Sequence, residues 1–574
     1  MFADSVYPLP RSTRRAGHIA VPSYLLVGAA LLSAVLVIGL ATAADYGFTI
    51  DEFNTDDYGP KALAWYTSGF TDRSHFETVE EWLWTYGPWA QILIAWVQSL
   101  HLSDPLAVRH AITFLIGLAG LAALLPLARM TVGRWGGPVA IVLCLMTGYF
   151  YGHLFFTPID VPFMTAMLWS LVAIVAMARQ TVPNWPLTIL AGLATGLAIA
   201  TRTGGIITHA YLVLAMGLCA LEAILLHRGA ARRQHLARVL AAIALRTATA
   251  MAVAWAFAIA LWPWLQIGNP FRQFMIAYTH FANIEAPFKF QHWGAEIATD
   301  DLPWSYVPAQ LLARLPEGFL VLLAAALMIA MVAGFLFARS ALMRTRVMGA
   351  AGLYAPLLAL SRMRGMIILI AATLVPVAFV IVNQTTMYDG IRHMLFIIPL
   401  LAVIAAGALV WMVPMLAARP LLAVIASVIG AGHISATALT LASLHPLQYV
   451  AINAIAGGTV GAQGRFEQDY WAAGATEALR QLERRLDYDR SGRFATRQAR
   501  ILICIPWREQ MVAPMLRRHF VVETDPAKAD FLIGTERWDC GKEVHVNKID
   551  EVERLGRGFA WTYANNPGKV ADQR

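Results

Sequence analysis

Residues 21–59 read VPSYLLVGAALLSAVLVIGLATAADYGFTIDEFNTDDYG, an apolar run over 21–44 followed at once by an acidic segment. The run is long enough to cross a bilayer, since about 20 apolar residues suffice for a helix. It is too long for a cleavable signal peptide, so we expect it to remain as a membrane anchor. Asp51 and Glu52 then lie at the membrane surface. Carboxylates there cost desolvation energy and usually have a function, the alternative being a solvated acidic loop.

Similar apolar runs recur along the first three quarters of the chain. The 574 residues are 58% hydrophobic and 14% charged, and the mean hydropathy is +0.56, a composition typical of polytopic membrane proteins. We predict an all-α membrane fold with a cytoplasmic segment (1–20), a transmembrane domain (21–443) and a C-terminal domain (444–574). The length criterion predicts about eleven spans, at 21–44, 105–128, 136–151, 160–178, 186–203, 205–227, 239–262, 317–338, 366–383, 392–414 and 420–443.

Arginines gather in alternate connections of this eleven-span chain. By the positive-inside rule these connections face the cytoplasm, so the N-terminus is expected inside and the C-terminal domain outside. This predicts a multi-pass protein of a bacterial inner membrane with a periplasmic C-terminus. The net charge of +8 reports this topology and not nucleic-acid binding. The arginines are Arg11, Arg14, Arg15, Arg129, Arg134, Arg179, Arg228, Arg232, Arg233, Arg238, Arg339, Arg344, Arg346, Arg362, Arg364 and Arg419.

The segments predicted outside are two long aromatic-rich loops, 45–104 and 263–316, and the C-terminal domain. Within the first loop, the stretch from Gly87 to Leu100 predicts a helix lying in the interface plane. In the C-terminal domain, strands are expected at 500–505, 520–523 and 531–534, with a helix over 507–519. This indicates a small α/β domain. Cys504 and Cys540 lie there, where a periplasmic location permits a disulfide, although their spacing does not decide the pairing.

Three polar clusters are expected to meet at the outer face. The first holds Asp51 and Glu52. The second lies in the turn over 151–162, where Asp160 precedes Pro162 and is either functional or only a helix cap. The third is the turn over 387–396. Other candidate residues in or near these clusters are Tyr58, Lys61, His153, Tyr388 and His393.

Arg202 and Arg392 lie on the predicted outer side, against the general charge bias. An arginine at the membrane edge can hold a phosphate through paired N–H donors, or it can extend to lipid headgroups. No glycine-rich nucleotide loop, serine nucleophile elbow or His/Cys set with metal-ligand spacing is present in the sequence. We therefore expect no cofactor, and a divalent metal, while possible, is not indicated.

Four motifs occur in an order that resembles a known superfamily. They are Thr49-Ile50-Asp51-Glu52 with Tyr58-Gly59, Tyr151-Gly152-His153 with Pro158-Ile159-Asp160-Val161-Pro162, Tyr388-Asp389-Gly390-Ile391-Arg392-His393, and the stretch from His445-Pro446 to Asp469-Tyr470-Trp471. With these motifs the chain resembles the polytopic GT-C glycosyltransferases. It is most similar to bacterial enzymes like the dolichyl-phosphate-mannose–protein mannosyltransferases, and beyond them to the lipid A aminoarabinose transferases.

The resemblance implies inverting transfer of a hexosyl or pentosyl group from a polyprenyl-phosphate donor on the outer face. It implies Asp51 as general base, Glu52 as its support and Asp160 as a second acidic residue that positions a substrate. Arg392 and His393, with Arg202 and Lys61, are candidates for the donor phosphate, and His153, Tyr58 and Tyr388 for substrate contacts. The expected partners are the lipid-linked sugar, membrane lipids and a lipid, glycan or protein acceptor. The β-trefoil domain of protein-modifying relatives has no counterpart here, which favours a lipid or surface glycan.

Other classes stay open at this point. A secondary transporter or lipid flippase is the main competitor, and a non-catalytic relative that binds a partner is a third. Transporters favour inverted repeats and broken helices near the bilayer midplane. Here the polar residues concentrate at one membrane face, which favours an enzyme.

Overall fold

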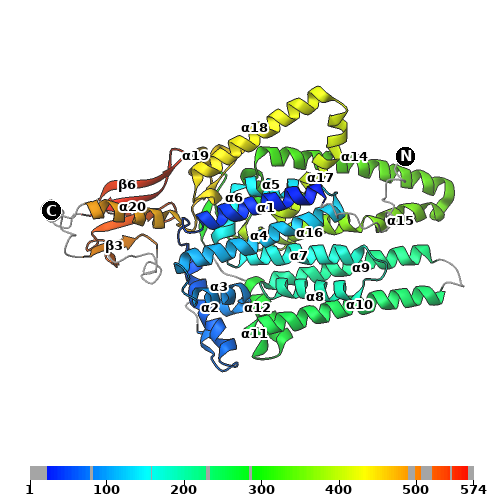
Figure 1. Ribbon diagram of the computed structural model, residues 1–574, viewed down its shortest axis with the longest axis horizontal. Coiled ribbons are helices and arrows are strands. Elements are labelled where there is room, and N and C mark those ends of the chain that lie inside the picture. Colours follow the sequence, from blue (N-terminus) through cyan, green and yellow to red (C-terminus); the bar gives the residue numbers. More distant parts are fainter. Residues whose placement is uncertain are drawn as a thin grey trace, which may run out of the picture.

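Long apolar helices run along the long axis of the molecule, and a small sheet lies at one end (Figure 1). The computed structural model describes residues 22–77, 82–156, 158–227, 233–282, 288–488, 498–505, 520–542, 544 and 546–565. The predicted N-terminal segment 1–20 and the predicted helix 507–519 lie outside these residues. The long helices are α1 (Ser23–Thr42), α4 (Pro105–Thr131), α7 (Asp160–Ala178), α9 (Ile207–Leu226), α10 (Arg233–Leu261), α14 (Glu317–Met348), α16 (Arg364–Val382), α17 (Ile397–Ala417) and α18 (Pro420–Leu444).

Each of the eleven predicted spans corresponds to helix. Among the described residues, nine helical segments are long and apolar enough to cross a membrane. The predicted span 136–151 is instead a pair, α5 (Gly136–Met146) and α6 (Gly148–Phe156), bent by 80°. The predicted span 186–203 is the shorter helix α8 (Trp185–Ile199). The protein is a multi-pass membrane protein, and the all-α membrane fold with a C-terminal α/β region is confirmed.

The bend between α5 and α6 comes from close packing. A Cβ atom on Gly152 would lie 2.5 Å from the backbone nitrogen of Tyr449, and one on Gly148 would lie 2.7 Å from the Cβ atom of Ala451. Helix α6 therefore lies against the segment 448–451, which follows the last span. If α5 continued in a straight line, this contact would be lost.

The basic connections meet at one end of the bundle. Arg179 donates to the carbonyl of Met130 at 3.4 Å, which joins the C-terminal ends of α7 and α4. Glu222 near the end of α9 pairs with Arg362 at 3.1 Å and with Arg364 at 2.8 Å. The eighth predicted span continues past its expected end at residue 338 and returns through α15 (Tyr354–Arg362). The resulting hairpin lies at the end opposite the sheet (Figure 1).

The two segments predicted as loops contain regular structure. The first holds α2 (Ile50–Thr67), the short helices η1 (Ser74–Phe76) and η2 (Leu83–Thr85), and α3 (Trp89–Gln98), which is the helix predicted near Gly87–Leu100. The second holds α11 (Pro263–Gln266), α12 (Pro270–Ala282), the antiparallel hairpin β1 (Lys289–His292) and β2 (Ala295–Ala298), and α13 (Tyr306–Arg314). Of these elements, α2, α3, α11 and α12 lie at the same end of the bundle as the sheet (Figure 1).

The C-terminal sheet has the order β4-β3-β5-β7-β6. The three predicted strands are β3 (Ala499–Ile503), β4 (Phe520–Val522) and β5 (Phe531–Thr535), with β3 parallel to both neighbours. The strands β6 (Asn547–Arg554) and β7 (Arg557–Ala564) and the helix α20 (Gly474–Tyr488) were not predicted from the sequence. Cys504 and Cys540 are joined by a disulfide.

Candidate active site

Residues from five separate parts of the chain surround one cavity of about 100 Å³ at the end of the bundle near the C-terminal sheet. They come from α2, from the η2 region, from the start of α7, from the link after α8 and from the turn before α17. The cavity therefore forms only when these helix ends come together. The lining residues are Asp51, Thr55, Trp82, Leu83, Tyr86, Pro158, Ile159, Asp160, Arg202, Tyr388, Arg392 and His393.

The first turn of α2 sends its two carboxylates in different directions. Glu52 is fully buried and accepts from the Thr49 backbone N–H at 3.0 Å and from the Thr49 hydroxyl at 2.9 Å, the pairing of a capping box. Its other oxygen lies 2.9 Å from Nε2 of His110. Asp51 faces the cavity instead and keeps 32% of its side chain exposed. Glu52 thus fixes the start of the helix, and Asp51 is the carboxylate that a substrate can reach.

Asp160 is held more tightly than Asp51. It is the first residue of α7 and only 2% of its side chain is exposed. Arg202 donates to it at 2.6 Å, and Nη1 of Arg392 lies 3.6 Å from its other oxygen. A carboxylate that is paired with two guanidinium groups and shielded from water is better suited to positioning a substrate than to abstracting a proton.

Arg392 connects the acidic residues of the site. Its Nη1 atom donates to Asp51 and lies near Asp160, and its Nη2 atom lies 3.1 Å from Asp389. Its Nε atom is buried and has no hydrogen-bond partner among the described residues. The guanidinium also lies over the rings of Tyr388 and Trp471, at 5.0 and 5.7 Å. The free N–H and the shared Nη1 leave donors that a ligand phosphate can use.

A tight turn delivers Arg392 to this position. Asp389 and Gly390 have left-handed backbone conformations, with φ of 58° and 69°. The Tyr306 hydroxyl donates to the carbonyl of Gly390 at 2.9 Å, and the Tyr149 hydroxyl donates to the carbonyl of Asp389 at 3.1 Å. The non-glycine residue Asp389 accepts this strained conformation because the neighbouring tyrosines hold the turn.

The electrostatics distinguish Asp51 from His393. Burial raises the pKa of Asp51, Arg392 lowers it, and the negative charges of Asp389 and Asp160 raise it again. The net direction is upward, which makes Asp51 a better proton acceptor than an ordinary surface aspartate. Burial lowers the pKa of His393 well below its usual range, and the charges of Arg392 and Arg202 lower it further. This direction favours the neutral form of His393, whose ring lines the cavity wall.

The structure brings six of the predicted residues to the cavity and leaves four outside its lining. Tyr58 is buried and donates to the carbonyl of Tyr86 at 2.8 Å, so it supports the wall from behind. His153 is buried in the core, with Nε2 3.1 Å from the hydroxyl of Tyr470. The six at the cavity are Asp51, Asp160, Arg202, Tyr388, Arg392 and His393, and the four outside its lining are Glu52, Tyr58, Lys61 and His153.

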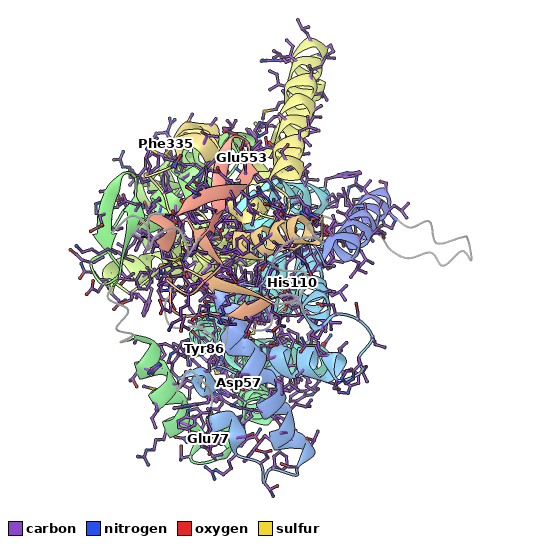
Figure 2. The ribbon with its side chains drawn as sticks, turned by 90° about the vertical axis from the view of Figure 1, so that its left-hand side faces the viewer. Asp57, Glu77, Tyr86, His110, Phe335 and Glu553 are labelled. Carbon is purple, nitrogen blue, oxygen red and sulfur yellow. A yellow bond between two sulfur atoms is a disulfide. The ribbon has the colours of Figure 1, made fainter. Side chains whose placement is uncertain are left out.

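Lys61 points away from the cavity. It pairs with Asp57 one helical turn earlier, at 2.7 Å, and donates to the carbonyl of Glu77 at 2.8 Å. Asp57 and Glu77 lie on the lobe formed by α2 and its neighbours (Figure 2). Lys61 therefore ties α2 to the following segment, and the prediction that it binds the donor phosphate is not supported by its position.

Several site residues were not predicted. Trp82, Tyr86 and Thr55 line the cavity, and Asp389 pairs with Arg392. Asp389 belongs to the third motif. Its position three residues before Arg392, in a predicted turn, could have indicated that the two side chains pair. Trp82 and Tyr86 belong to the first aromatic-rich loop, and the sequence did not single them out. In the described part of the chain no group of three or more His, Cys, Asp or Glu side chains is arranged to hold a metal ion, and the expectation about metals stays a prediction.

Comparisons with known proteins were made on the sequence and on the fold. No family model and no curated protein matches the sequence. ArnT from Cupriavidus metallidurans in the apo state aligns over 95% of this chain and 98% of its own, with 11% identity and a TM-score of 0.44. The same protein bound to undecaprenyl phosphate aligns with 12% identity and a TM-score of 0.41, over 95% and 99% of the two chains.

A second structural match is the archaeal oligosaccharyltransferase AglB from Archaeoglobus fulgidus, in complex with an inhibitory peptide and a dolichol-phosphate. It aligns with 12% identity and a TM-score of 0.43, over 88% of this chain and 65% of its own. With TM-scores below 0.5, the matches carry nothing about substrate or mechanism.

Proposed function

We propose that this protein is an inverting glycosyltransferase that moves a sugar from a polyprenyl-phosphate donor to an acceptor hydroxyl at the outer face of a bacterial inner membrane. The observation that carries the proposal is the Asp51–Arg392 pair. It joins an accessible carboxylate with a raised pKa to a guanidinium suited to phosphate, at one end of a bundle of membrane helices. A lipid-linked donor reaches such a site from the bilayer.

In the proposed reaction, Asp51 accepts the proton of the acceptor hydroxyl as the hydroxyl oxygen attacks the anomeric carbon. A new C–O bond forms on one face of the sugar, and the bond from the anomeric carbon to the phosphate oxygen breaks on the other. Its electron pair stays with the phosphate. Arg392 and Arg202 stabilise this developing charge, because fixed cations in a partly dry site act strongly on it.

The size of the cavity limits what it holds. Its volume of about 100 Å³ is smaller than the ~300–1,000 Å³ of common ligand pockets. It suits the phosphate end of the donor, with the sugar and the acceptor at its mouth. Asp51, the most exposed of the acidic residues around Arg392, lies at that mouth. The sugar is either a hexose or a pentose, and we favour a lipid or surface glycan as acceptor over a protein.

The test is transfer by purified protein. The full chain is incubated with labelled polyprenyl-phosphate sugars and a membrane extract, and the labelled product is identified together with its anomeric configuration. We expect an inverted product that requires Asp51. Transport of the lipid-linked sugar across vesicles without any transfer would instead establish a flippase. The bent pair α5–α6 is a feature shared with transporters, so this outcome must be measured.

A further inference from the structure

The turn over 387–396, which carries Arg392, is joined to the C-terminal sheet by an ion pair. Asp389 is only 5% exposed, and its two carboxylate oxygens face two guanidinium groups. One oxygen lies 3.1 Å from Nη2 of Arg392, and the other lies 2.7 Å from Nη2 of Arg537. Arg537 comes from the turn that follows β5 in the sheet. A residue of the C-terminal domain thus shares a buried partner with the centre of the candidate active site.

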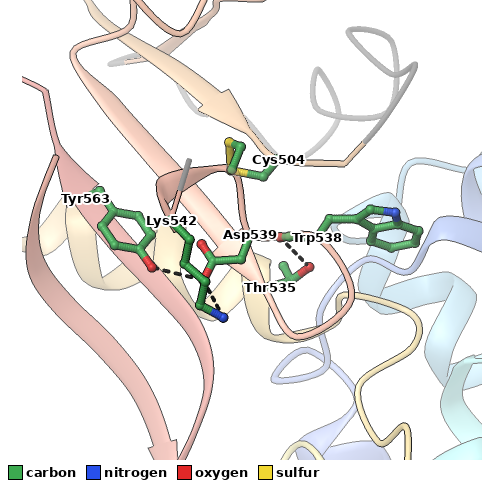
Figure 3. Close-up of a disulfide and its surroundings, with 7 residues drawn as sticks. Cys504, Thr535, Trp538, Asp539, Lys542 and Tyr563 are labelled. Carbon is green, nitrogen blue, oxygen red and sulfur yellow. Dashed lines mark hydrogen bonds and ion pairs between the residues drawn. A yellow bond between two sulfur atoms is a disulfide. The ribbon is translucent and has the colours of Figure 1, made fainter. Parts of the chain in front are cut away.

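The turn that carries Arg537 is fixed from both sides. The Thr535 N–H donates to the carbonyl of Trp538 at 2.6 Å, and the Asp539 carboxylate accepts from the Tyr563 hydroxyl at 3.1 Å. Cys540 follows in its disulfide with Cys504 (Figure 3). The sheet therefore presents Arg537 from a rigid support.

Arg537 also has a second anchor, in the segment that follows the last membrane helix. Its Nε and Nη2 atoms bond the two oxygens of Glu467, both at 2.5 Å. Shortly after Glu467, the carbonyl of Trp471 accepts from the backbone N–H of Ile50, at 3.3 Å, where α2 begins. The segment from Glu467 to Trp471 thus contacts Arg537, Arg392 and the start of the helix that carries Asp51.

We propose that Arg537 is a positioning residue for the donor-phosphate site, acting through Asp389 on Arg392. This inference rests on the proposed function. By Coulomb's law, the positive charge of Arg537 offsets part of the negative potential that Asp389 exerts at Arg392. Without Arg537, Arg392 is the remaining described cation within ion-pair distance of Asp389. Asp389 then holds Arg392 more strongly and opposes its contact with a phosphate. The C-terminal domain is, on this view, part of the active site.

The test measures binding of undecaprenyl phosphate to the full chain in detergent, together with the donor KM and kcat of transfer. The variants are Arg537→Gln, Asp389→Asn and the double variant. The matched control is Arg500→Gln, which removes the same charge from the same sheet at a side chain that is 51% exposed. We expect roughly tenfold weaker binding and a correspondingly higher donor KM for Arg537→Gln. We expect kcat to change far less, and the control to behave like the wild type.

The double variant decides whether the effect runs through Asp389. Once Asp389 is neutral, Arg537→Gln should weaken binding no further. Additive losses would overturn the inference, as would equal binding by Arg537→Gln and the control, and in both cases the proposed function would stand. Failure of the wild-type protein to bind undecaprenyl phosphate would remove the proposed function and the inference with it. If Arg537→Gln does not fold, Arg537→Lys, which keeps the charge but loses the paired geometry, should bind undecaprenyl phosphate nearly as well as the wild type, and a tenfold loss would overturn the inference.

Discussion

Replacing Asp51 with Asn tests the central pair of the site, because it removes one charge and almost no volume. The substitution takes away the proton acceptor, and loss of a general base typically costs about 10²–10⁴-fold in rate. It also removes a competitor for Arg392. The same change should therefore lower kcat while it strengthens donor binding, and a loss of folded protein cannot produce both effects.

The size of the binding effect follows from the contacts of Arg392. A hydrogen bond to a charged group contributes about 1.5–3 kcal/mol, which corresponds to a roughly 10- to 100-fold gain if Asp51 were its only partner. Asp160 and Asp389 still hold Arg392, so we expect the lower end, near tenfold.

The assay pairs transfer kinetics with binding of undecaprenyl phosphate. The matched control is Asp57→Asn, the same change on the same helix at a side chain that is 31% exposed and pairs with Lys61 away from the cavity. We expect the control to match the wild type in both measurements. Undiminished transfer by Asp51→Asn would refute the assignment of the base. A fall in rate together with weaker donor binding would refute the competition between Asp51 and the phosphate.

Three further predictions concern other parts of the site. Because Arg392 lowers the raised pKa of Asp51, Arg392→Gln should move the acidic limb of the kcat/KM profile to higher pH and weaken donor binding; an unshifted limb would contradict this electrostatic account. Glu52→Gln should cost about 1–3 kcal/mol of stability and lower Tm, since Glu52 caps α2 and bonds His110; a Tm equal to that of the wild type with a hundredfold loss of kcat would show that Glu52 is catalytic. Reduction of the Cys504–Cys540 disulfide should destabilise the C-terminal domain by about 4 kcal/mol on the chain-entropy model and lower its Tm. Cys504→Ser should show the same lower Tm without reductant. A Tm equal to that of the oxidised wild type in both cases would exclude the effect.

The membrane helices could be predicted because their signal is local. An apolar run of sufficient length specifies a helix wherever it occurs. The bend between α5 and α6 could not be predicted in this way, because it depends on how Gly148 and Gly152 meet the segment 448–451, about 300 residues later in the chain. The strand β6 has charged residues at five of its eight positions, which hides it from a pattern of hydrophobicity. The strand β7 was not predicted although Arg557 is the one charged residue among its eight.

The charged residues of the cavity were predictable for a related reason. Arg202 and Arg392 lie on the predicted outer side against the general charge bias, and Asp51 follows the first apolar run closely, where a carboxylate is costly unless it has a function. The structural roles of Glu52 and Lys61 also had local signals in the sequence. Thr49 and Glu52 have the spacing of a capping box, and Lys61 lies four residues after Asp57, the spacing of a helical ion pair.

Arg537 had no such signal. Its partner Asp389 lies far away in the chain, and only the packing of the C-terminal sheet on the membrane helices joins them. His153 and Tyr58 were misplaced for a similar reason, because the sequence does not show which face of a helix is covered by a later segment. What escaped prediction is therefore mostly the contribution of the C-terminal domain.

The charges around Arg392 define how the proposed donor must bind. Four carboxylates, Asp51, Asp160, Asp389 and Glu467, surround three guanidinium groups, Arg202, Arg392 and Arg537. If all are ionised, the cluster carries one net negative charge, so it does not attract a phosphate by net charge.

On the proposed mechanism, binding of the donor is an exchange, in which the phosphate takes the place of Asp51 on Arg392 and frees Asp51 to act as base. After transfer, Asp51 carries the acceptor proton and is neutral, so it no longer competes for Arg392. The released polyprenyl phosphate stays bound until Asp51 loses that proton. Loss of the proton and departure of the lipid phosphate are thus one coupled event, because both depend on the same position on Arg392.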